Sequence, residues 1–199
     1  IMNVCKEYDF EFVYIKYEGT NPCENINTAL DNCDGRIIKI MFSDDIFIND
    51  NALEIIRNEY ARTGCNWAFS GFSNWDGKDK YDIKKPEWTP ELLQGRNLLS
   101  SPTVVSLLNR CKVEFDTELK LLLDVDFYHR MRWKHGMPHI IDDVLVANRE
   151  HDDRISSQAT SQYDMVYQHP TGGWLMNRRE LNYVESKYSN FTGRYFDEM

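Results

Sequence analysis

The sequence has no apolar run approaching the roughly 20 residues that a membrane-spanning helix needs. Its first residues, Ile1-Met2-Asn3-Val4-Cys5-Lys6, do not have the layout of a signal peptide. An opening isoleucine suggests a chain that begins mid-gene or has been trimmed. We therefore expect neither a membrane span nor a secretory leader in this chain.

Cysteine pairs at close spacing are also missing. The five cysteines lie at positions 5, 23, 33, 65 and 111, and no Cys-x-x-Cys motif occurs. This argues against a zinc knuckle or a redox pair. Reduced thiols in a cytoplasmic protein are the simplest interpretation.

Positive charge is scarce, because 23 basic side chains face 32 acidic ones, for a formal net charge of −9 with no Lys/Arg block. Broad attraction to nucleic acid or to anionic lipid is thus disfavoured. No GxxxxGK[ST] phosphate loop is present, which counts against one rival function, a metal-dependent phosphoryl or nucleotidyl transferase.

The chain has enough apolar material for one domain, with 42% hydrophobic and 13% aromatic residues among 199. Periodicity and turn residues predict strands at 10–17, 37–42, 66–72 and 144–148, and helices at 24–33, 52–62, 104–109, 125–135, 158–169 and 174–188. A long polar loop is expected at 73–90. Alternating strands and helices predict an α/β fold with a mostly parallel sheet flanked by helices. We expect a catalytic domain at 1–157, with a C-terminal helical extension at 158–199 packed on it.

The pattern centres on residues 37–45, where a continuous apolar run is followed at once by Ser43, Asp44 and Asp45. Such a run predicts a central strand covered on both faces, and its carboxyl end is where open α/β sheets place ligands. Two adjacent carboxylates repel each other and stay ionised only beside water, a donor or a cation. A divalent metal carrying a diphosphate would meet that need. The alternative is an acidic turn in which Asp44 caps the next segment.

The motifs before and after this acidic pair match, in order and spacing, those of a known protein family. Asn27-Thr28-Ala29-Leu30 and Gly35 precede the strand and the acidic pair, and further matching segments are Leu123–Arg130 and Asn148–His151. Together they resemble the nucleotide-sugar half of family 2 glycosyltransferases with the GT-A fold, over roughly residues 10–157. The resemblance implies a Rossmann-type sheet, but nothing matches the family's first strand. That strand is therefore expected to be absent or reduced, with 10–17 standing for the second strand and Glu18 near the base-binding position.

The resemblance also implies roles in donor binding. Asp45 matches the last acid of the family's Asp-x-Asp element and would bind Mn2+ or Mg2+, while Asp44 would touch the ribose or share the metal. Asn27 matches an Asn near the nucleotide, and His151 would complete the metal shell as its loop closes. A surface helix Asn and a solvated loop His remain the alternatives for these two.

Asp124 matches the family's catalytic base. Its alternative is a charge that only stabilises a helix N-terminus, with Asp126 beside it. A base needs a pKa near the working pH, so burial would have to oppose the helix dipole. Asp126 and Arg130, one turn apart, are expected to form a supporting ion pair. Leu123 departs from the Glu often found before this Asp.

Two further residues are assigned to the donor sugar by the same resemblance. Ser101 matches a segment beside that sugar, and otherwise caps the next helix. Arg154 would assist the diphosphate. Trp75 and Trp88 would either stack on an acceptor sugar or anchor the long loop.

The sequence thus predicts an inverting, metal-dependent glycosyltransferase of hexosyltransferase type. The expected donor is a nucleotide-diphospho-sugar, UDP-sugars first, and the acceptor is a carbohydrate or other hydroxyl. The alternative is a non-catalytic GT-A-like carbohydrate-binding or assembly module. C-terminal aromatic residues would pack on the core or on a second subunit, which would give a homodimer.

Overall fold

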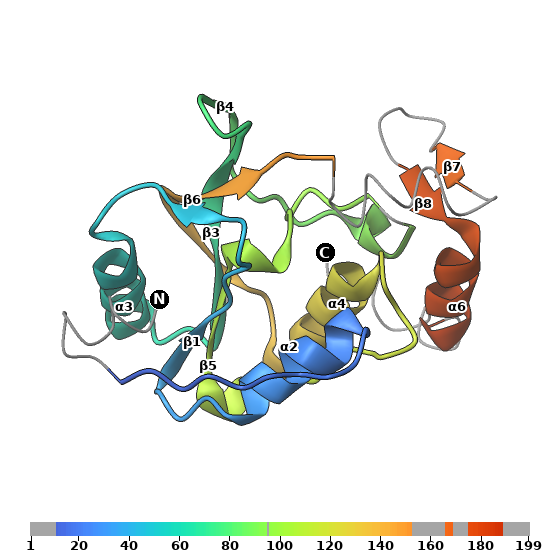
Figure 1. The fold of residues 1–199 in the computed structure, drawn as a ribbon, viewed down its shortest axis with the longest axis horizontal. Helices are drawn as coiled ribbons and strands as arrows, with labels where there is room; N and C mark the ends of the chain where they lie inside the picture. The colour runs from blue at the N-terminus through green and yellow to red at the C-terminus, as the bar shows by residue number, and fades with distance from the viewer. Residues whose placement is uncertain (1–10, 95, 153–165, 169–174, 189–199) are drawn as a thin grey trace.

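The computed structural model describes residues 11–94, 96–152, 166–168 and 175–188. A sheet with the strand order β1-β5-β3-β6-β2 forms the centre of the molecule, and β4 pairs with β3 off this path (Figure 1). The strands are β1 (Ile37–Lys39), β2 (Ile46–Phe47), β3 (Trp67–Trp75), β4 (Lys80–Lys84), β5 (Val105–Leu108) and β6 (His139–Arg149).

The directions of the strands decide which ends meet at one edge. β3 and β6 are parallel, whereas β5 runs antiparallel to both of its neighbours, β1 and β3. β1, β3 and β6 therefore all run the same way, and β2, β4 and β5 run against them. The predicted α/β class with flanking helices is confirmed, and the sheet is mixed.

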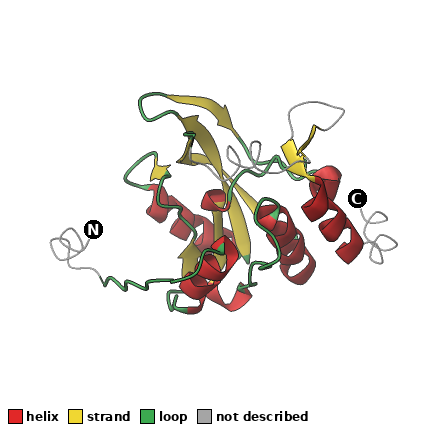
Figure 2. Ribbon diagram, turned by 45° about the vertical axis from the view of Figure 1, so that its right-hand side comes forward, coloured by secondary structure: helices red, strands yellow, loops and turns green. Residues whose placement is uncertain are grey.

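Within the described residues, the α-helices that accompany the sheet are α2 (Pro22–Asp31), α3 (Ala52–Thr63), α4 (Leu123–His135) and α6 (Arg178–Tyr188). Short 3-10 turns are η1 (Pro90–Gln94), η2 (Pro102–Val104) and η3 (Asn109–Cys111), and β7 (Val166–Gln168) pairs with β8 (Leu175–Asn177). α3 lies on one side of the sheet and α2 and α4 on the other, with α6 beyond α4 (Figure 1). Figure 2 shows the helices gathered below the twisted strands of the β3–β4 hairpin.

The helix ends follow from local chemistry. Asn21 caps α2 by accepting a hydrogen bond from the backbone N of Cys23 at 2.9 Å, and Pro22 takes the first helical position. α3 ends at Gly64, whose φ of 68° lies in the left-handed region that glycine adopts without strain. The predicted helices at 24–33, 52–62 and 125–135 are confirmed within two residues at each end.

Aromatic side chains hold α4 against the sheet. The ring of Tyr128 meets that of Phe69 on β3 edge-on, with centroids 4.9 Å apart, and Phe127 stacks on Phe115 at 4.2 Å. All four residues are almost fully buried. Burial of side chains this large contributes about 2 to 3 kcal/mol each, so the position of α4 is well fixed.

Several predicted elements differ from the structure. Residues 11–17 form no strand, and the described part of the predicted loop at 73–90 contains the end of β3 and all of β4. The predicted helix at 104–109 is mostly strand β5, and residues 166–168, predicted helical, form β7. β1 lies at one end of the sheet rather than at its centre.

Cys23, Cys33, Cys65 and Cys111 are free thiols. Among the described residues, none of the helices combines the length and the apolar character needed to cross a bilayer.

Candidate active site

Asp45 joins the ends of two strands. It lies in the turn after β1, and its Oδ1 accepts a hydrogen bond of 2.9 Å from the backbone N of Arg149, the last residue of β6. Its Oδ2 accepts the hydroxyl proton of Thr103, and the Thr103 hydroxyl also accepts from the backbone N of Phe42 at 3.2 Å. The acidic pair thus lies at the edge where β1, β3 and β6 end, as the sequence predicted.

Asp44 pairs with the predicted loop histidine. His151, two residues beyond β6, places Nε2 2.8 Å from Oδ2 of Asp44. Both side chains are partly exposed, His151 at 30% and Asp44 at 37%. A ligand can therefore reach this pair from solvent.

Ser100 and Ser101 connect this edge to the segment before η2. The Ser101 hydroxyl donates to Oδ1 of Asn148 at 3.1 Å, and Nδ2 of Asn148 donates to the hydroxyl of Ser100 at 2.7 Å. Ser101 makes no side-chain capping bond to η2, so the alternative capping role is not seen. Ser100 has a φ of 76°, a left-handed conformation that is uncommon for a residue with a side chain and recurs at functional sites.

Asp124 is tied to the same segment. Nδ2 of Asn97 donates to Oδ2 of Asp124 at 2.6 Å and to the carbonyl of Ser100 at 3.1 Å. The hydroxyl of Tyr128, one turn along α4, also donates to the Ser100 carbonyl, at 2.9 Å. The other Asp124 oxygen accepts from the backbone N of Val125 at 2.8 Å.

The electrostatics of Asp124 match those of a general base. Burial raises the pKa of its carboxyl to about 7, against the opposing effect of the hydrogen bonds from Val125 and Asn97. Burial thus outweighs the lowering effect of the backbone hydrogen bonds at the start of α4. A carboxyl with a pKa near neutrality can both take and release a proton at physiological pH.

A chain of polar contacts therefore links the two predicted carboxylates. It runs from Asp45 to the Arg149 backbone, through the adjacent Asn148 to the Ser100–Ser101 turn, and from there through Asn97 to Asp124. Asp45 and Asp124 thus belong to one edge of the molecule, although they lie 79 positions apart in the sequence.

The side chains at this edge do not form a metal site made of protein ligands alone. Among the described residues, no three His, Cys, Asp or Glu side chains are grouped so that they could hold a metal ion. A site built only from protein ligands is thus not supported. Asp44 and His151 bond to each other, and Asp45 is held by Thr103 and the Arg149 backbone, so these side chains do not form a three-ligand group. Carboxylate oxygens such as those of Asp44 and Asp45 suit a divalent cation that takes most of its ligands from substrate phosphates and water.

Lys39 is a polar residue at this edge that sequence reasoning missed. Its Nζ donates to the carbonyls of Thr103 and, at 3.0 Å, of Ile40. Burial lowers its pKa to about 7, and the nearby charge of Asp45 opposes this effect. A single lysine inside the apolar run at 37–42 was the available signal.

The two loop tryptophans differ. Trp88 is an anchor, because its ring packs edge-on against Trp67 at 6.3 Å and under the guanidinium of Arg132. Trp75 ends β3, its carbonyl accepts from the backbone N of Glu150 at 2.7 Å, and the Arg149 guanidinium lies 5.6 Å from its ring. Trp75 therefore lies at the same edge as Asp45.

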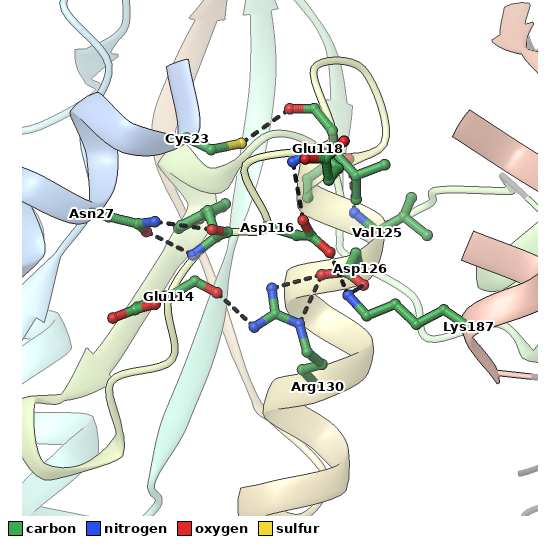
Figure 3. Close-up of polar contacts among 12 residues, drawn as sticks. Cys23, Asn27, Glu114, Asp116, Glu118, Val125, Asp126, Arg130 and Lys187 are labelled. Carbon is green, nitrogen blue, oxygen red and sulfur yellow. Dashed lines mark hydrogen bonds and ion pairs between the residues drawn. The ribbon is translucent and has the colours of Figure 1, made fainter. Parts of the chain in front are cut away.

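Two predicted site residues, Asn27 and Glu18, are not part of this network, and a third is not among the described residues. Asn27 makes two hydrogen bonds to the backbone of Phe115, at 2.9 and 2.6 Å, and so ties α2 to the segment before α4 (Figure 3). Glu18 is exposed and pairs with Lys16 at 2.7 Å. Arg154 lies outside the described residues.

Comparison with known proteins gives a fold and no family. No protein-family model and no curated protein matches the chain. Among solved structures, the chain is similar to S. aureus TarS 1–349, a glycosyltransferase, with a TM-score of 0.56 and 12% sequence identity. The match covers 100% of this chain and 62% of the TarS chain, so the chain spans less than two thirds of the length of that structure. At this identity the likeness shows a glycosyltransferase-like fold.

Proposed function

We propose that the protein transfers a sugar from a nucleotide-diphospho-sugar to a hydroxyl acceptor, with inversion at the anomeric carbon. The observation that carries the proposal is the connection between Asp45 and Asp124, one a carboxylate at the strand ends and the other a carboxyl with a pKa of about 7. The glycosyltransferase-like fold supports the same chemistry.

Asp124 is assigned the role of general base. It would accept the proton of the acceptor hydroxyl while that oxygen attacks the anomeric carbon and the diphosphate leaves. The amide of Asn97 orients the Asp124 carboxylate, and the fixed Ser100–Ser101 turn forms the wall beside the sugar. UDP is the nucleotide that we propose first.

Asp44, Asp45 and His151 are proposed to hold Mn2+ or Mg2+ together with the donor diphosphate. When bound, the cation would act as a Lewis acid that neutralises charge on the leaving group. The hydrogen bonds from Thr103 and the Arg149 backbone fix the orientation of Asp45 for this task.

The test is the Asp124→Asn variant, assayed for sugar transfer and donor hydrolysis with Mn2+. We expect kcat to fall by about 100-fold or more, because proton transfer by a positioned group contributes that much. An exposed carboxylate, Asp142→Asn, serves as the control, since its side chain is 85% exposed. Near-wild-type turnover by Asp124→Asn would remove the base from the mechanism.

A second function has an observation of its own. Asp44 and His151 already bond to each other, and no larger ligand group surrounds them among the described residues. If this pair stays bonded and holds no cation, the alternative is a non-catalytic module that binds carbohydrate without metal. Calorimetry separates the two, because metal-dependent UDP binding supports the enzyme and metal-independent sugar binding supports the module.

A further inference from the structure

The helix that carries Asp124 begins without a cap of its own. Leu122 occupies the capping position of α4 and has no side chain that could accept a hydrogen bond. Helix N-termini leave several backbone N–H groups without an intrahelical partner. The turn that leads into α4 and ends at Leu122 likewise has backbone N–H groups that need an acceptor from elsewhere in the molecule.

Glu180 of α6 supplies that acceptor. Its carboxylate accepts hydrogen bonds from three consecutive backbone N–H groups, at 3.1 Å from Lys120, 2.9 Å from Leu121 and 2.9 Å from Leu122. Consecutive N–H groups that converge in this way form a concave anion site. Glu180 is only 9% exposed, so its bonds are shielded from competing water.

The rest of α6 holds Glu180 in place. Lys187 donates to Asp116 at 2.6 Å and to Asp126 on α4 at 2.8 Å, and the approach of Lys187 to Asp126 is visible in Figure 3. Tyr188 donates its hydroxyl to the same Asp126 at 2.6 Å. α6 is thus fixed to α4 at both of its ends.

We propose that Glu180 is a positioning residue for Asp124: by binding the backbone of residues 120–122 from α6, it sets the first turn of α4 and aims Asp124 at Asn97. Asp124 lies two residues after the last of the three bonded N–H groups. The inference rests on the proposed function, in which Asp124 is the base.

Glu180 also acts on the charge of Asp124. The groups that face Asp124 within the described residues are the amide of Asn97, the phenol of Tyr128 on α4, and Glu180 on α6. Tyr128 stays neutral because burial raises its pKa well above the usual value. Glu180 is the charged member of this set, and its negative charge raises the pKa of Asp124 in addition to burial.

The experiment is Glu180→Gln in the full chain, with the Asp124 carboxyl followed by 13C NMR titration. The resonance is assigned by its loss in Asp124→Asn. We expect the pKa of Asp124 to fall, because a like charge has been removed. In the transfer assay, we expect the acid limb of the pH profile to shift to lower pH. We also expect the factor by which kcat falls to exceed the factor by which KM rises. An unchanged Asp124 pKa would overturn the proposal.

The control on the same helix is Tyr183→Phe, which removes a 3.0 Å bond to Asp116 and leaves the Glu180 bonds to residues 120–122 in place. If Tyr183→Phe lowers the pKa of Asp124 as much as Glu180→Gln does, the effect comes from docking of α6 in general and the proposal fails.

Should Glu180→Gln not fold, Glu180→Asp keeps the charge and shortens the reach. We then expect a near-wild-type pKa for Asp124 and a reduced kcat, and a wild-type kcat would overturn the proposal. The titration needs no sugar transfer. Failure of the proposed function, seen as full activity in Asp124→Asn, is therefore distinguishable from failure of this inference.

Discussion

Asp124 couples activity to stability at the scale of a single side chain. An unfolded aspartate has a pKa of about 4, whereas burial raises that of folded Asp124 to about 7. Between these values the folded protein holds a proton that the unfolded chain has lost. The contribution of this group to stability is therefore complete below the unfolded pKa and is lost as pH rises through the folded one.

Replacement of Asp124 by Asn should remove this pH dependence. The amide cannot ionise, so relative to wild type the variant should gain stability as pH rises from about 4 to about 7. The gain is on the order of a few kcal/mol, or several degrees in Tm for a chain of this size. Thermal unfolding of both proteins across this range measures the change. A Tm difference that stays constant with pH would contradict the burial of an ionisable group at this position.

At the scale of elements, α4 and α6 depend on a buried ionic group. Asp126 is fully buried and accepts hydrogen bonds from Arg130 on its own helix, at 2.7 Å, and from Lys187 and Tyr188 on α6. The predicted Asp126–Arg130 pair is confirmed. The sequence did not predict that α6 also shares this carboxylate.

Removal of the shared carboxylate should therefore loosen two helices at once. Asp126→Ala leaves Arg130 without its anion and Lys187 with Asp116 alone, and we expect a loss of about 3 to 5 kcal/mol in the free energy of unfolding. The matched control is Asp142→Ala, which breaks an exposed 2.9 Å pair with Lys85 and should cost under about 1 kcal/mol. Urea unfolding measures both. Equal losses would mean that Asp126 does not hold α6 to α4.

Local patterns predicted the helices better than the strands. α2 and α3 carry their own apolar faces, and α3 and α4 end at glycines, so local sequence suffices to predict these helices. The run Val104-Val105-Ser106-Leu107-Leu108 fits either a short helix or a buried strand, and only its pairing between β1 and β3 decides for β5. Residues 11–17 have strand-forming composition, yet the structure gives them no strand partner among the described residues.

The site was predicted in part for a similar reason. The motifs that identified Asp44, Asp45, Asp124 and His151 are short and local, and the structure brings them to one edge. Asn97, Asn148 and Glu180 were missed because their roles depend on contacts with residues 27 to 60 positions away. No spacing rule in a single sequence reports such contacts.

The whole molecule has a glycosyltransferase-like fold but spans 62% of the TarS chain that it resembles. Donor binding is therefore the property to measure on the chain as it stands. Asp44 and Asp45 lie where β1 and β6 end, and the side chain of Asp44 is partly exposed to solvent. Such carboxylates suit a divalent cation that binds together with a diphosphate. UDP and Mn2+ should each bind more tightly when the other is present. The diphosphate would supply ligands to the cation, and the cation would neutralise the charge of the diphosphate.

Thermal unfolding with UDP and Mn2+ tests this expectation. At ligand concentrations about 100 times Kd, binding to the folded state adds about 2.7 kcal/mol, which corresponds to roughly 5 to 10 °C in Tm. Asp44→Ala should abolish the part of the shift that requires Mn2+, whereas Asp142→Ala should preserve it. A Tm shift that persists in a chelator, or that simple sugars produce without metal, would instead favour the carbohydrate-binding module. Such binding would not require the cation that Asp44 and Asp45 are proposed to hold.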